Sequence, residues 1–270
     1  MYLYHLTALP PGGANHVAYG SFSAARKQEV VLASGSSLQL FRLSKVGQLE
    51  SVARADAFAT VRAIAPFRLV GSRQDFLLVT SDAGTLSLLS FSAYTRSFTR
   101  ARCEVFGKTG CRRAVPGQFL AADPKGRACM VGALERSKFA YILTRDVSEL
   151  ITIRSPLEAH KSGVATHALV ALDVGFANPM FAALERPYEE SDGPKLLVYY
   201  ELDLGLNHVV RRYASPVDAF SYVLLPVPGG TDGPGGVLVC SPGKVSYRNL
   251  VEEQEAADAT SEEGFYVTPY

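Results

Sequence analysis

Short runs of alternating apolar and polar residues recur along the whole chain, and helical periodicity is nearly absent. An alternation with period two is typical of half-buried β-strands, because successive side chains point to opposite faces of a sheet. Segments rich in Asp, Gly, Pro and Ser separate the runs, and these residues supply the backbone angles that tight turns require. This pattern predicts an all-β fold, which could be a sandwich, a barrel or a propeller.

The spacing of the turns favours a propeller among these three. Turn signals lie at residues 82–84, 123–126 and 146, and the first two are separated by roughly the 40–45 residues that one four-stranded blade occupies. About twenty candidate strands then correspond to about five blades. The chain contains no Trp, so it lacks the Trp-Asp signature of WD40 repeats, and we expect a divergent, WD40-like propeller. The clearest candidate strands are residues 28–33, 38–43, 75–81, 85–92, 119–122, 128–134, 139–144, 165–174, 180–184, 196–201, 207–213, 222–226, 237–240 and 245–247.

Charge divides the chain into two parts. Residues 251–270 contain six acidic residues and no Lys or Arg, whereas the whole chain carries a net charge of only +1. We expect residues 1–250 to form the propeller portion and 251–270 to be a disordered acidic tail, which could instead fold back on a basic surface or bind a partner. No run of 18 apolar residues exists, and the first twenty residues do not resemble a secretory signal.

No pattern of residues in the sequence predicts catalysis. There is no G-x-S-x-G elbow and no H-E-x-x-H pair, and the Gly107-Lys108-Thr109 segment fails as a phosphate-binding loop because Arg102 stands where the first Gly is required. The four cysteines match no common zinc spacing, which favours reduced, buried thiols over a disulfide or a metal site. We therefore expect a non-enzymatic protein with no catalytic, cofactor-binding or metal-binding residues.

Basic residues cluster once in the sequence. The cluster consists of Lys108, Arg112, Arg113, Lys125 and Arg127. A solvated face explains such a cluster, and a contact with an acidic protein loop or with RNA phosphates is the alternative. We expect Arg112, Arg113 and Lys125 on loops that face a partner. Aromatic residues do not interleave with the cluster as single-strand RNA binding requires, so direct reading of bases is not supported.

Several long segments resemble one protein family. These are residues 105–130 (VFGKTGCRRAVPGQFLAADPKGRACM), 155–161 (SPLEAHK), 173–185 (DVGFANPMFAALE), 200–211 (YELDLGLNHVVR) and 227–240 (VPGGTDGPGGVLVC). They are similar to the splicing factor 3b subunit 3 family, the large triple-propeller subunit of the U2 small nuclear ribonucleoprotein. The wider superfamily includes the damaged-DNA-binding adaptor of cullin ligases and the large subunit of the cleavage and polyadenylation specificity factor.

The resemblance implies a function as well as a fold. It covers Met1 to about Tyr247, and it implies about five blades of a seven-bladed first propeller, whose remaining blades and later propellers lie outside the 270 residues. It implies a nuclear, non-enzymatic scaffold that supports branch-site recognition in pre-mRNA splicing. The implied partners are a HEAT-repeat subunit, a small zinc-finger subunit and a small helical subunit, with RNA contacted indirectly at most and with no membrane or small-molecule substrate.

Two other functions stay open on the sequence alone. A propeller adaptor of a ubiquitin ligase, or of the cleavage and polyadenylation machinery, would use the same architecture. A propeller hydrolase would require carboxylates that converge at a central channel.

Overall fold

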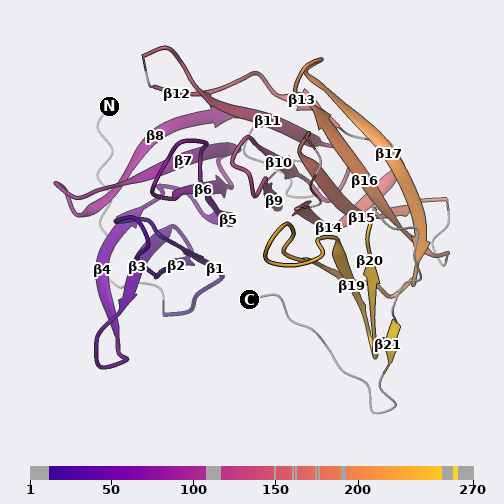
Figure 1. Cartoon of the computed structure of the whole chain (residues 1–270), viewed down its shortest axis with the longest axis horizontal. Helices are drawn as coiled ribbons and strands as arrows, with labels where there is room; N and C mark the ends of the chain where they lie inside the picture. The colour runs from indigo at the N-terminus through magenta and orange to yellow at the C-terminus, as the bar shows by residue number, and fades with distance from the viewer. Residues whose placement is uncertain are drawn as a thin grey trace.

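The computed structural model describes residues 12–107, 117–148, 150–159, 161, 163–173, 175, 177–189, 193–250 and 258–260. Across these residues the chain forms 21 strands in five antiparallel sheets, and no helix is present in them. The sheets follow one another around an arc, from β1 on one arm to β21 on the other (Figure 1). The predicted all-β propeller of about five blades is therefore confirmed.

Each sheet is one blade, and its strands pair in sequence order. Blade 1 contains β1 (His16–Gly20), β2 (Glu29–Ser34), β3 (Ser37–Leu43) and β4 (Leu49–Asp56). Blade 2 contains β5 (Val61–Phe67), β6 (Phe76–Ser81), β7 (Thr85–Ser92) and β8 (Ser97–Val105). Blade 3 contains β9 (Phe119–Ala122), β10 (Ala128–Gly132), β11 (Lys138–Arg145), β12 (Ile151–Ile153) and β13 (Leu157–Glu158), of which β12 and β13 both pair with β11.

The last two blades repeat the pattern. Blade 4 contains β14 (Val164–Leu172), β15 (Met180–Pro187), β16 (Lys195–Asp203) and β17 (His208–Val217). Blade 5 contains β18 (Val223–Pro226), β19 (Val237–Ser241), β20 (Lys244–Arg248) and β21 (Asp258–Thr260). Strand β21 lies within residues 251–270, and its three residues pair with β20. The other residues of that predicted tail lie outside the described part of the chain.

The first strand of every blade is the innermost one. Contacts run from β1 to β5, from β5 to β9, from β9 to β14 and from β14 to β18, so that successive inner strands line the centre of the arc. Each inner strand starts at one face of the propeller and ends at the other, and the chain then returns along the second strand. All loops that follow an inner strand therefore lie on one face.

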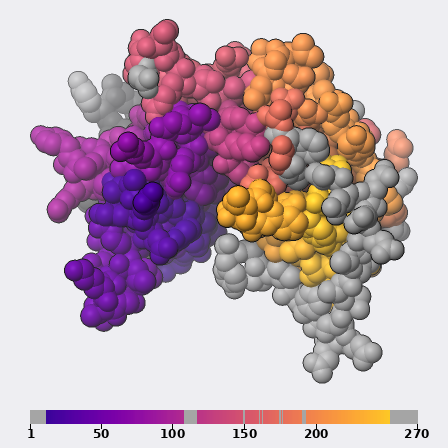
Figure 2. Space-filling view, viewed as in Figure 1, coloured from indigo at the N-terminus to yellow at the C-terminus, as the bar shows by residue number. Residues whose placement is uncertain are grey.

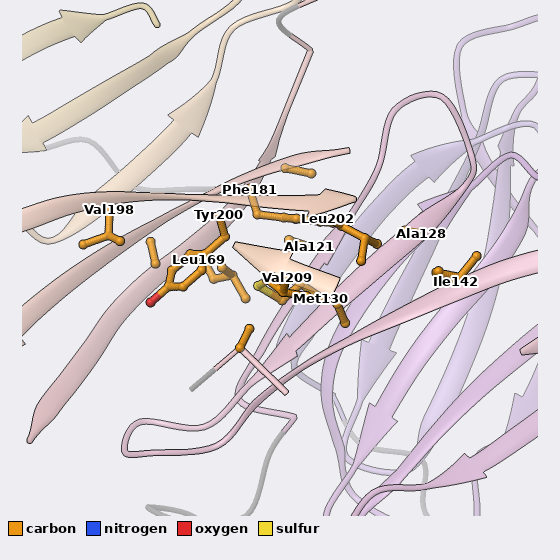
Figure 3. Packing of buried hydrophobic residues seen from close by; sticks show 14 residues of the cluster. Ala121, Ala128, Met130, Ile142, Leu169, Phe181, Val198, Tyr200, Leu202 and Val209 are labelled. Atoms are coloured by element: carbon orange, nitrogen blue, oxygen red, sulfur yellow. The ribbon is translucent and has the colours of Figure 1, made fainter. Parts of the chain in front are cut away.

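The hydrophobic core lies between blades. Four clusters of buried side chains each draw on two neighbouring blades, and none lies within a single sheet. The second strand of blade 3 shows the reason: Ala128 and Met130 pack toward blade 4, whereas Cys129 and Val131 pack toward blade 2. Figure 3 shows Met130 beside Leu169 and Val209 of blade 4. Because each fully buried aliphatic side chain contributes roughly 1.5–3 kcal/mol, this packing holds successive blades together.

A buried ion pair also joins blades 3 and 4. Lys138 Nζ of β11 lies 2.8 Å from Glu185 Oε1 of β15, and both side chains are fully buried. Tyr200 donates a hydrogen bond of 2.6 Å to the same carboxylate oxygen, and the ammonium group lies over the Tyr200 ring. Arg211 of β17 approaches the other oxygen at 3.8 Å. Burial removes both charges from water, so each charge is compensated by the other instead of by hydration.

Removal of one charge of this pair is expected to destabilise the protein strongly. Substitution K138M leaves the Glu185 carboxylate buried without its ammonium partner, and we expect the free energy of unfolding to fall by about 3–5 kcal/mol in urea denaturation. The double substitution K138M/E185M removes both charges, and we expect it to cost less than K138M alone. A double variant that is as unstable as the sum of the two single variants would contradict the assigned pairing.

Candidate protein-interaction face

The loops that leave the inner strands form what we call the exit face. It comprises residues 21–28, 68–75, 123–127, 173, 175, 177–179 and 227–236. Loops at the ends of rigid strands are where propellers and other repeat folds present binding residues. The opposite face carries the points where the chain enters the inner strands.

A cavity of about 670 Å³ opens at the centre of the exit face. Its lining comes from the ends of all five inner strands, and it consists mainly of small residues and prolines such as Pro66, Pro124 and Pro226. In Figure 2 the orange loop that follows β18 lies beside the violet surface of the first blades, and Tyr19 of β1 lines the same cavity as Pro228. The charged side chains that line it are Arg68, Asp75, Asp123 and Asp173.

Hydrogen bonds and an ion pair tie the exit loops of blades 1 and 2 together. Asp75 accepts two hydrogen bonds from the Arg68 guanidinium, at 2.7 and 3.0 Å, and a third from the backbone N–H of Ser21 in blade 1, at 2.7 Å. The hydrogen bonds to Asp75 raise the pKa of Arg68. The side chain of Gln74 adds a hydrogen bond to the Ser23 carbonyl. These contacts hold both loops in one arrangement.

Glu29 anchors the exit loop of blade 1 from beneath. Its buried carboxylate accepts hydrogen bonds from the backbone N–H groups of Phe22 and Ser23, from the Ser23 hydroxyl and from the Arg42 guanidinium. Burial raises the pKa of Glu29, but the hydrogen bonds from Ser23 and Arg42 together outweigh burial, so the pKa lies below its ordinary value. The carboxylate is therefore held ionised by the loop that it supports.

The two predicted site residues that the structure describes both lie on the exit face. Lys125 is exposed at the tip of the β9–β10 turn. Arg127 follows it, and its guanidinium forms an ion pair with Asp123 at 2.8 Å and donates a hydrogen bond to the carbonyl of Ala177 in blade 4. Arg127 thus connects two blades, in addition to any contact that it makes outside the chain.

The other three predicted residues, Lys108, Arg112 and Arg113, lie outside the described residues. Of the described residues that flank them in sequence, Gly107 donates a hydrogen bond to the Gly84 carbonyl in the β6–β7 turn, and Gly117 donates one to the Gly132 carbonyl at the end of β10. The partner contact expected of these three residues stays a prediction.

The charge of the exit face is uneven. The loops of blades 1 to 3 include Arg26, Lys27, Arg73 and Lys125, whereas the described loops of blades 4 and 5 carry Asp173 and Asp232 and no basic residue. Sequence reasoning missed Arg73, Arg145 and Arg154, which the fold brings together in blades 2 and 3. No local pattern could have identified them, because they lie in three separate segments: two loops and the end of β11.

The described residues contain no group of three or more His, Cys, Asp or Glu side chains that could hold a metal ion. Cys103, Cys129 and Cys240 are free thiols, and burial raises the pKa of Cys129 and of Cys240. Within the same residues, no helix is long and apolar enough to cross a membrane. The candidate functional feature of the described residues is therefore the loop surface of the exit face.

A comparison with protein families gives a match over most of the chain. The family model described as the RSE1/DDB1/CPSF1 first beta-propeller matches residues 13–264. The chain belongs to this family. The match explains the divergence from WD40 repeats that the absence of Trp indicated.

Curated relatives narrow the resemblance within the family. The chain is 46% identical to splicing factor 3B subunit 3 of Drosophila melanogaster over 266 residues, which cover 94% of the chain. It is 48% identical to pre-mRNA-splicing factor rse1 of Neurospora crassa over 264 residues, and 44% identical to spliceosome-associated protein 130 A of Arabidopsis thaliana over 259 residues. The chain spans 21–22% of the length of these relatives. The family suggested by the sequence segments is thus confirmed.

Because the exit loops of blades 2 and 3 lie in close contact, we expect a methyl group added at Gly126 to lower the free energy of unfolding strongly. A Cβ atom at Gly126 would overlap the carbonyl oxygen of Arg68 in blade 2, whereas a Cβ atom at Gly71 would meet no atom within 4 Å. Both glycines have positive φ angles, 70° and 80°, so both substitutions carry a similar backbone cost. We expect G71A to cost about 1 kcal/mol and G126A at least about 2 kcal/mol more. Urea denaturation measures both, and equal costs would show that the loops do not touch.

The Glu29 network predicts a specific loss of stability in acid. Because the pKa of Glu29 is lower in the folded chain than its ordinary 4.5, its contribution is complete above pH 4.5 and is lost as the pH falls through the folded value. We expect the stability difference between the wild type and E29Q to shrink from pH 7 to pH 3, measured by urea denaturation. E50Q, at an exposed position on β4, is the matched control. A difference that stays constant with pH would contradict the network.

Proposed function

We propose that this chain acts in pre-mRNA splicing as a non-enzymatic scaffold portion of the splicing factor 3b complex. The observation that carries the proposal is the identity of 44–48% to proteins named as splicing factors over more than nine tenths of the chain. The proposal assigns it to protein–protein contacts that support branch-site recognition and spliceosome assembly. Because relatives are about five times longer, these contacts belong to the propeller portion that the chain shares with them.

The fold is suited to such a role. Blades held by inter-blade cores give a rigid frame, and the exit loops are fixed to one another by hydrogen bonds and ion pairs. A rigid loop face lowers the conformational entropy lost on binding, which favours a surface for partner proteins. We place the chain in the nucleus, with a HEAT-repeat subunit, a small zinc-finger subunit and a small helical subunit as its partners.

Two alternatives come from other members of the superfamily. A ubiquitin-ligase adaptor would bind a cullin, and a component of the cleavage and polyadenylation machinery would bind other processing factors. The match of the family model covers all three branches, so the fold by itself favours none of them. The named relatives favour splicing.

Affinity purification from nuclear extract tests the proposal. We expect the tagged chain to enrich the HEAT-repeat splicing subunit over an unrelated propeller used as control. A parallel measurement with a purified cullin N-terminal domain is expected to show no binding. Enrichment equal to the control, or binding to the cullin domain, would overturn the assignment to splicing.

A further inference from the structure

Two hollows lie side by side on the exit face of blades 2 and 3. One has a volume of about 480 Å³ and is lined by Arg73, Gln74 and Phe76 together with Arg145. The other has a volume of about 360 Å³ and is lined by Val70, Arg154 and Leu204, also together with Arg145. The loop of residues 69–73 borders both. We call the two hollows together the arginine groove.

The arginine groove combines an apolar floor with a basic rim. Leu69, Ile142 and Leu143 are almost fully buried beneath it, and Val70 is 62% exposed at its edge. The guanidinium of Arg145 donates a hydrogen bond of 2.7 Å to Ser72 Oγ, which fixes its position between the hollows. Arg154 donates to the neutral side chain of Asn207. The guanidinium groups therefore surround an apolar depression.

The carboxylates near the groove are engaged elsewhere. Asp75 pairs with Arg68, and Asp123 pairs with Arg127. Asp146 and Asp203 accept hydrogen bonds from N–H groups of their own loops. By contrast, Arg73 and Arg154 form no ion pair among the described residues. Arg73 and Arg154 therefore form no direct ion pair with these neighbouring carboxylates.

From this geometry we propose that the arginine groove binds an acidic segment of a partner protein, with an apolar side chain of that segment seated over Val70 and Leu204. Carboxylates pair with guanidinium groups through charge-assisted hydrogen bonds, and Arg is enriched at the centres of protein interfaces. A single-stranded RNA fits less well, because Phe76 is the one aromatic side chain that lines the groove and no platform for base stacking is formed. The inference rests on the proposed function and names the chemistry of one contact within it.

Selection from a displayed library of random 12-residue peptides tests the proposal on the whole chain. We expect enriched peptides to carry a net negative charge and at least one Leu, Ile, Val or Phe. Their affinity, measured by fluorescence anisotropy, is expected to fall at least about tenfold in R73E/R154E and to fall again when salt is raised. We expect V70S, which shortens an exposed apolar wall, to weaken binding several-fold without loss of the fold.

Charge itself needs a matched control. The double substitution K45E/R96E changes the net charge by the same amount at exposed positions on the outer turns of blades 1 and 2, and we expect it to leave peptide affinity within about twofold. Enriched peptides without acidic residues, no enrichment, or equal losses in the two double variants would overturn the proposal. Equally tight binding of a fluorescent oligouridine that depends on Arg73 and Arg154 would also overturn it, in favour of an RNA surface.

This result is separable from the splicing assignment. If R73E/R154E no longer binds the peptide but still enriches the HEAT-repeat subunit, the proposed function is retained, and the main contact with that subunit lies outside the arginine groove. If the wild-type chain fails to enrich the HEAT-repeat subunit but selects acidic peptides as expected, the splicing role alone would be overturned.

Discussion

The sheets of the central blades must be covered on both faces. A strand in the middle of such a blade has no solvent-facing side, so its alternate residues belong to two different cores. The second strands β10 and β15 show this in their composition: ACMVG is buried throughout, and in β15 the first six residues are buried. The arc of the propeller follows from it, because each sheet is held by its two neighbours rather than by a core of its own.

The same constraint explains which strands could be predicted from the sequence. The second strands β6, β10 and β15 have apolar runs because they are buried, and these runs indicated strands. The outer strands β4 and β8 did not stand out. Strand β4, with the sequence LESVARAD, has one buried residue, and β8 also has one buried residue and exposes Thr99, Arg100 and Arg102. Their extended conformation comes from pairing with β3 and β7, which no local pattern records.

The number of blades was predicted correctly, but the turns used to estimate the blade length are not equivalent. Residues 82–84 join the second and third strands of blade 2, whereas residues 123–126 join the first and second strands of blade 3. Asp146 begins a turn between the third and fourth strands of blade 3. Arg73 and Arg154 converge only through blade packing, which sequence spacing does not encode.

The crossing of guanidinium and carboxylate groups between blades has a mechanical consequence. Arg127 reaches Ala177 in the next blade, and Asp75 reaches back to Ser21 in the previous one. A load applied to one exit loop is therefore shared with the loops on either side instead of bending a single hairpin. Because the exit loops are coupled in this way, a partner protein bound to one loop would displace the neighbouring blades together with it.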